Sequence, residues 1–210
     1  MKIERVVKKD DENVVIWLDN QEKLFLSYEV FLKNRLKKDM EISEDGFSFL
    51  IKENQKYFIK KKAFQFLGRR LHSYNELKIK LLRKKYDIAL VTEVLDYLKE
   101  KSFLDDYEFA KMYTEEKVRT KLWGLNKIKS ELFRKGIQAE IIEKILAEVD
   151  LLPVENAMSA GEKKLNILMK RNYTARELSS KLYTYLYSKG YDYDTIKEVT
   201  DRLLKSEDIT

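Results

Sequence analysis

The chain has 210 residues, 44% of them hydrophobic and 37% charged, with a formal net charge of +6. That is enough apolar material for a core, which excludes a chain disordered throughout, and the absence of cysteine excludes disulfides and thiolate zinc sites. With 6 glycines and 1 proline the sequence favours helices joined by short polar loops.

The first 60 residues differ from the rest because they contain short runs of β-branched and aromatic residues. Two such runs within residues 14–27 predict a hairpin, and Ile3–Lys8 is a candidate third strand. A lone hairpin is only marginally stable in water, so we expect it to pack on a helix. Tyr28–Leu36 and Ser43–Asn54 are the candidate helices, with Ser43 as a suitable N-cap.

From residue 55 onward the chain is predicted to be helical, and one apolar pattern recurs about every 50 residues. Its three copies align without gaps, and they start at Leu77, Ile128 and Leu182. Another amphipathic stretch precedes each copy, namely Ala63–Leu71, Phe109–Val118 and Ala157–Leu168. Each unit is therefore predicted to contain three helices.

The turn inside each copy follows one design, in which a basic residue precedes the position where the helix ends. Gly136 and Gly190 occupy this position in the second and third copies, as expected for a helix that stops at a left-handed residue. Lys85 occupies it in the first copy. It must either adopt a strained left-handed conformation or end its helix in another way.

These patterns predict a mainly α fold, with three tandem three-helix repeats in an elongated, curved array behind a small N-terminal β-hairpin and helix segment. The expected domains are residues 1–60, 61–108, 109–152 and 153–210.

Few residues are suited to catalysis, so we expect neither an enzyme nor a bound cofactor. His72 is the only histidine, and its place just before Ser73 predicts an exposed linker residue. The sequence contains no glycine-rich phosphate-binding loop. It also lacks a signal peptide and a run of apolar residues long enough to cross a membrane, so we expect a cytoplasmic protein that acts as a monomer.

An acidic cluster follows Leu104 and precedes Phe109. Asp105 and Asp106 are candidate magnesium ligands, but no second acidic cluster converges on them in the sequence. The favoured interpretation is that one of the two caps the helix that begins here.

Residues 60–85 form a dense basic segment, with ten cationic side chains and only one carboxylate, Glu76. This density favours binding to a polyanion, although a solvated surface that keeps the protein soluble is the alternative. The candidate filament-binding or DNA-binding residues are Lys61, Lys62, Arg69, Arg70, Lys80, Arg83, Lys84 and Lys85.

Five tyrosines fall within residues 183–193. Tyr183 and Tyr187 are one helical turn apart beside Lys181 and Lys189, which makes them candidates to stack on unpaired bases. Packing against neighbouring helices is the alternative, and the one that we favour.

The sequence resembles the RecX family of recombination regulators between Lys61 and Leu204. The resemblance rests on the leucine-rich turn Leu132–Ile137, the Leu-Asp-Asp-x-x-Phe-Ala element at Leu104–Ala110, and the three tandem units behind a variable N-terminal segment. The first unit departs from the pattern because Lys85 replaces the turn glycine, and the third lacks a strong counterpart of the Asp-Asp element.

This resemblance implies a regulator that binds the filament of RecA recombinase on single-stranded DNA. Such proteins mostly inhibit strand exchange, ATP hydrolysis and coprotease activity, and thereby regulate DNA repair and the SOS response. Some also bind DNA weakly on their own. Two alternatives stay open on the residues alone: a helical module that binds nucleic acid without a recombinase, and a helical scaffold for another protein.

Overall fold

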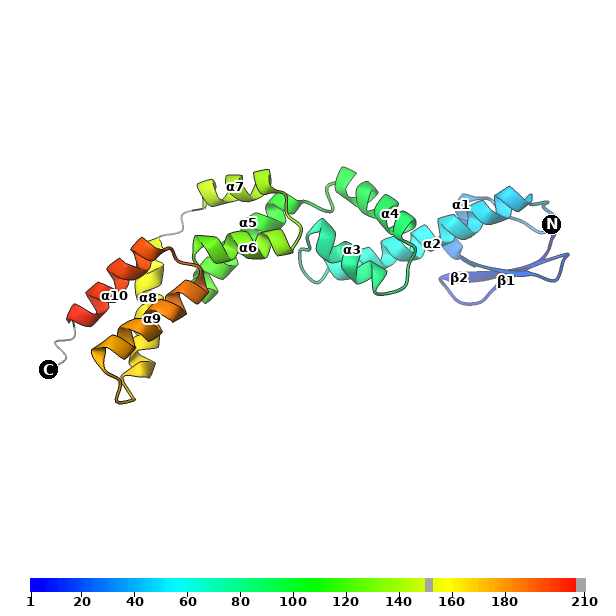
Figure 1. Cartoon of the computed structure of the whole chain (residues 1–210). Helices are drawn as coiled ribbons and strands as arrows, with labels where there is room; N and C mark the ends of the chain where they lie inside the picture. The colour runs from blue at the N-terminus through cyan, green and yellow to red at the C-terminus, as the bar shows by residue number, and fades with distance from the viewer. Residues whose placement is uncertain (150–152, 207–210) are drawn as a thin grey trace. The chain divides into compact units, whose positions relative to one another are not determined.

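The computed structural model describes residues 1–149 and 153–206, and the chain forms two compact units that divide between Leu104 and Asp105. Both units are mainly helical, and the first also contains a small sheet (Figure 1). The predicted class, a mainly α fold of three-helix repeats behind a small β-containing segment, is confirmed.

The sheet consists of β1 (Ile3–Lys8), β2 (Asn13–Leu18) and β3 (Lys23–Ser27), which are antiparallel and lie in the order β1-β2-β3. All three predicted strands are therefore present. Side chains alternate in β2, where Val14, Ile16 and Leu18 are buried against the helices while the residues between them lie on the opposite face.

Two helices cover the inner face of the sheet, α1 (Tyr28–Lys33) and the first half of α2 (Glu44–Leu67). The Ser43 hydroxyl accepts a hydrogen bond from the Gly46 N–H, as predicted for an N-cap. Asn54 fastens α2 to β3, because its side chain accepts from the Ser27 N–H at 2.7 Å and donates to the Phe25 carbonyl at 2.8 Å.

Helix α2 is one continuous helix and not the two separate helices that the sequence predicted (Figure 1). Leu50 and Ile59 are nine residues apart, which places them on opposite sides of a helix. Leu50 packs in the core beneath the sheet, whereas Ile59 and Ala63 pack in the core of the first repeat. The helix therefore belongs to two cores at once and joins the sheet to the repeat.

The first repeat is completed by α3 (Tyr74–Leu82) and α4 (Ile88–Glu100). Its core contains Leu77 and Leu81 of α3 together with four residues of α4, and Leu104 closes it at the end of the unit.

The second unit contains the other two repeats. The second repeat consists of α5 (Asp106–Lys121), α6 (Leu125–Arg134) and α7 (Ala139–Glu148), and the third of α8 (Pro153–Leu168), α9 (Ala175–Lys189) and α10 (Tyr193–Ser206). The equivalent positions Leu81, Leu132 and Leu186 are all fully buried, each in the core of its own repeat.

The predicted domain divisions relate to these helices in different ways. The divisions after residues 60 and 108 fall inside α2 and α5. The division after residue 152 adjoins the segment 150–152, which lies outside the described residues.

The carboxylates at the start of α5 cap this helix. Asp105 accepts from the N–H groups of Tyr107 at 2.8 Å and Glu108 at 3.1 Å, while Asp106 occupies the first turn. Phe109 is buried in the core of the second repeat. No group of three or more potential metal-ligating side chains converges within residues 1–149 and 153–206.

All three turn positions are left-handed, with φ of 62° at Lys85, 78° at Gly136 and 90° at Gly190. The first of the two alternatives for Lys85 is therefore correct. After Gly136, the Ile137 N–H returns to the Leu132 carbonyl, and after Gly190 the Tyr191 N–H returns to the Leu186 carbonyl. These bonds close the helix ends and direct the next apolar side chain into the core.

The second and third repeats are joined by direct backbone contacts. The Gly124 N–H donates to the Lys189 carbonyl at 2.9 Å, and the Asn126 N–H donates to the Gly190 carbonyl at 3.1 Å. The Tyr191 hydroxyl donates to the Leu122 carbonyl at 3.0 Å, and burial raises the pKa of this phenol above its usual value. The turn at Gly190 in the third repeat therefore packs directly against the start of α6.

Candidate nucleic-acid interface

The structure divides the predicted basic segment into two groups at opposite ends of α3. Arg69 and Arg70 precede this helix, whereas Arg83, Lys84 and Lys85 follow it. A helix of this length extends about 14 Å, so the two groups cannot contact one phosphate together.

Cations from α2 and from the last turn of α3 converge on one aromatic ring. The ammonium groups of Lys62 and Lys80 lie 5.5 and 5.2 Å from the centroid of Phe66. Arg70 forms an ion pair with Glu76 at 3.0 Å. The cations here are therefore ordered by contacts within the unit.

His72 is buried within this group, with 3% of its surface exposed, so the prediction of an exposed linker residue is wrong. Its Nδ1 donates to the Arg70 carbonyl at 2.9 Å, and its Nε2 lies 2.6 Å from the Lys80 ammonium. Because a carbonyl can only accept and an ammonium can only donate, this geometry requires the neutral ring. Burial lowers the pKa of His72 below its usual value, and the charges of Arg70 and Lys80 lower it further.

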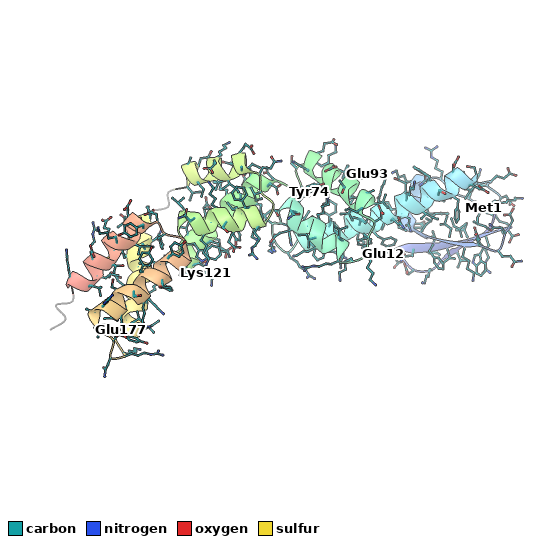
Figure 2. The ribbon with its side chains drawn as sticks, in the orientation of Figure 1. Met1, Glu12, Tyr74, Glu93, Lys121 and Glu177 are labelled. Carbon is teal, nitrogen blue, oxygen red and sulfur yellow. The ribbon has the colours of Figure 1, made fainter. Side chains whose placement is uncertain are left out.

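Lys61 points away from this group. It forms an ion pair with Glu12 of the β1–β2 turn, whose position Figure 2 labels. It therefore contributes to the contact between α2 and the sheet, and of the eight predicted residues it is the one directed at the N-terminal segment.

The most accessible cations are Arg69 and the three residues at the end of α3. All four are exposed, and none of them forms an ion pair with another described residue. A polyanion could approach them without first displacing a carboxylate.

Tyr183 and Tyr187 stack on each other, with ring centroids 6.2 Å apart and planes 8° apart. The edge of Tyr193 approaches Tyr183 at 6.4 Å. Tyr187 is 67% exposed and Tyr193 61% exposed, so these rings form a surface cluster outside the core of the third repeat. Tyr185, in contrast, packs partly buried against that core.

Sequence reasoning missed a second basic cluster, in the third repeat. It comes from α8, the loop after it and α9, and its cations are Lys164, Arg171 and Lys181. A local excess of charge does mark them, since residues 163–181 contain six cations and a single carboxylate, Glu177, but only the denser segment 60–85 was singled out from the sequence.

Each of the three repeats matches a family model. Residues 60–98 match the first three-helix domain of RecX, residues 105–146 match the second, and residues 153–200 match the third. No helix in the described part of the chain is long and apolar enough to span a membrane.

Curated relatives match over nearly the whole length. The chain is 32% identical to the regulatory protein RecX of Clostridium botulinum (strain Alaska E43 / Type E3) over 203 residues, which cover 96% of this chain and 95% of that one. It is also 32% identical to the regulatory protein RecX of Finegoldia magna, with 95% and 97% of the two chains covered.

Solved structures share the fold. One, described as a crystal structure of regulatory protein RecX, matches with a TM-score of 0.75 at 21% identity, covering 95% of this chain and 98% of that one. The crystal structure of RecX from Lactobacillus salivarius matches with a TM-score of 0.61 at 25% identity, covering 72% and 97%.

Proposed function

The chain belongs to the RecX family of regulatory proteins, and from this premise we propose that it binds the RecA filament on single-stranded DNA and inhibits the recombinase. The chain would also inhibit the ATP hydrolysis and the coprotease activity of the filament. Through these effects it would regulate DNA repair and the SOS response. The observation that carries the proposal is the presence of all three family domains, in order, over residues 60–200.

The charge distribution supports this proposal. A nucleoprotein filament is a polyanion, and exposed cations increase both the rate and the strength of binding to it. Repeated modules also allow one chain to contact several filament subunits, so that modest contacts add up to tight binding. The predicted contact residues are the eight of the basic segment, with Tyr183 and Tyr187 as candidates for base stacking.

The test reverses three exposed cations of the basic segment, as Arg69→Glu, Arg83→Glu and Lys84→Glu in one variant. We expect it to lose inhibition of filament-dependent ATP hydrolysis, because attraction becomes repulsion at the contact surface. Circular dichroism should show unchanged helicity, since none of the three side chains is buried.

The matched control reverses three exposed lysines of the N-terminal segment, Lys37, Lys38 and Lys52, and should still inhibit. Unaltered inhibition by the first variant, or equal loss in the control, would reject the assignment of the basic segment. Titration of the wild-type chain against DNA alone, recombinase alone and the filament separates this function from a module that binds nucleic acid by itself. Binding to DNA alone as tight as to the filament would contradict the proposal.

A further inference from the structure

A groove of about 540 Å³ lies between α8 and α9 in the third repeat. It extends from the loop before α9, where Arg171 and Tyr173 lie, toward Ser188 near the end of that helix. Figure 2 labels two residues near α9, namely Glu177 in its first turn and Lys121, whose carbonyl accepts a hydrogen bond from Lys189. Lys164 and Lys181 line the groove from α8 and α9.

The groove has an unbalanced positive charge. It is lined by Lys164, Arg171 and Lys181 but by no carboxylate, and these three cations form no ion pair with any described residue. Glu177 lies close to Lys181, but the N–H and hydroxyl of Thr174 already hold its carboxylate at 2.8 and 2.9 Å. The lining itself therefore contains three cations and no carboxylate, while Glu177 outside it offsets part of the charge of Lys181.

Further cations lie at the end of the groove near Ser188. The Lys189 ammonium donates to the Lys121 carbonyl at 2.6 Å and lies 5.4 Å from the centroid of Tyr185. Burial lowers the pKa of Lys189 below its usual value, and repulsion from Lys121 and Lys163 lowers it further. Cations that repel one another without a carboxylate between them would be stabilised by a bound anion.

Two aromatic rings form part of the groove wall, and cations lie against both. The Lys181 ammonium lies 4.5 Å from the centroid of Tyr173, and the Lys164 ammonium lies 5.4 Å from that of Tyr185. Grooves that bind single strands combine cations along the backbone with aromatic side chains for the bases. We propose that this groove binds the backbone of a single nucleic-acid strand, with Lys164, Arg171 and Lys181 at the phosphates and Tyr173 and Tyr185 beside the bases.

The lining favours a nucleic-acid strand over an acidic protein surface. Protein interfaces have an apolar centre, but besides the tyrosines the only apolar side chain in this groove is Leu168. The remaining lining residues carry hydroxyls, a group that commonly contacts phosphate. The Thr184 and Ser188 hydroxyls donate to the Ser180 and Tyr185 carbonyls and would exchange these bonds on contacting a phosphate, whereas Ser180 also lines the groove. The site deepens the proposed function, on which it rests, because it gives the chain a direct contact to the DNA of the filament.

The test measures binding of the full chain to a fluorescent oligothymidylate of about 15 nucleotides, long enough for one such site, by anisotropy at several salt concentrations. In the variant K164Q/K181Q we expect affinity to fall at least about tenfold at low salt. The slope of log affinity against log salt should also decrease by about 1.4, since each lost phosphate contact contributes about 0.7 on a single strand.

The matched control K197Q/K205Q removes the same charge from exposed positions of α10 in the same repeat and should bind like the wild type. Equal binding by both variants would overturn the groove assignment. So would a groove variant that binds the oligonucleotide normally but loses binding to DNA-free recombinase, because the occupant would then be a protein.

Inhibition of filament-dependent ATP hydrolysis, measured in parallel, keeps the two proposals apart. Wild-type inhibition together with equal oligonucleotide binding by both variants would reject the groove and leave the function standing. No inhibition by the wild type, with oligonucleotide binding lost only in K164Q/K181Q, would reject the function and leave the groove standing.

Discussion

At the scale of single residues, Lys85 shows a conflict between local backbone preference and the repeat. The chain must turn here in the left-handed region so that Tyr86 can pack against the core of the first repeat. Gly136 and Gly190 adopt the same conformation without a Cβ to oppose it. The Cβ of Lys85 is therefore sterically unfavourable at a position where the other two repeats have glycine and no such cost.

Lys85→Gly should therefore stabilise the first unit by about 1 kcal/mol, the difference between the left-handed cost of a side chain and the entropy that glycine loses on folding. Urea unfolding measures this change. Lys85→Ala is the matched control, because alanine has a Cβ like lysine but lacks the charge. If the glycine variant is no more stable than the alanine variant, backbone strain at this turn is not the cause.

Single residues also differ in whether their burial can be predicted from the sequence. Leu81, Leu132 and Leu186 could be predicted as core residues because their apolar pattern recurs in three copies. The burial of His72 could not, because a single polar residue beside a helix cap has no periodicity. His72 is buried because Phe66 and Lys80, which come from two different helices, pack against it. Only the folded chain brings these residues together.

At the scale of helices and strands, the sequence predicted which segments are helices and which are strands, but it did not predict that α2 is one continuous helix. Helix α2 lacks a single apolar stripe, because Leu50 faces the core beneath the sheet while Ile59, on the opposite side, faces the first repeat. The two halves of α2 are apolar on different sides, so the sequence pattern predicted two separate helices. The excess of positive charge in residues 163–181 could be read from the sequence, but the groove that its cations line forms only when α8 and α9 pair.

The joint between the second and third repeats rests on two glycines in close contact. A Cβ on Gly124 would lie 2.6 Å from the Gly190 carbonyl oxygen and 2.8 Å from the Tyr191 nitrogen. These are backbone atoms, so the clash cannot be relieved by rotating a side chain. The approach of the two backbones at this point is what allows the hydrogen bonds of Gly124 and Asn126 to form.

Gly124→Ala should therefore destabilise the second unit by about 1–3 kcal/mol, the usual range for overpacking in a well-packed site. Thermal or urea unfolding measures the loss, and hydrogen exchange at the Asn126 amide should accelerate because its bond to Gly190 is weakened. Gly68→Ala is the control, since Gly68 is exposed with φ of −65° and its added Cβ would meet only the Phe64 carbonyl oxygen, at 3.3 Å, so stability should change by less than about 1 kcal/mol in either direction. Equal stability of the two variants would show that the joint tolerates a side chain.

At the scale of the whole molecule, the net charge of +6 is modest, and its distribution matters more than its size. The most accessible cations of the basic segment surround α3 in the first unit, and the groove cations surround α9 in the second. A chain with two separate basic surfaces can bind one long polyanion at two places. Each surface alone then needs only modest affinity for the combined binding to be tight.

This arrangement predicts how losses combine on the filament. The groove variant K164Q/K181Q and the triple reversal at Arg69, Arg83 and Lys84 alter different units and share no partner, so their free-energy costs should add. The fold-losses in filament affinity should therefore multiply in the combined variant, as measured by competition for labelled filament at one fixed salt concentration. A combined loss no larger than that of the triple reversal alone would mean that the groove is not engaged when the chain is on the filament. Additive losses that disappear together at high salt would identify both surfaces as electrostatic contacts with the same polyanion.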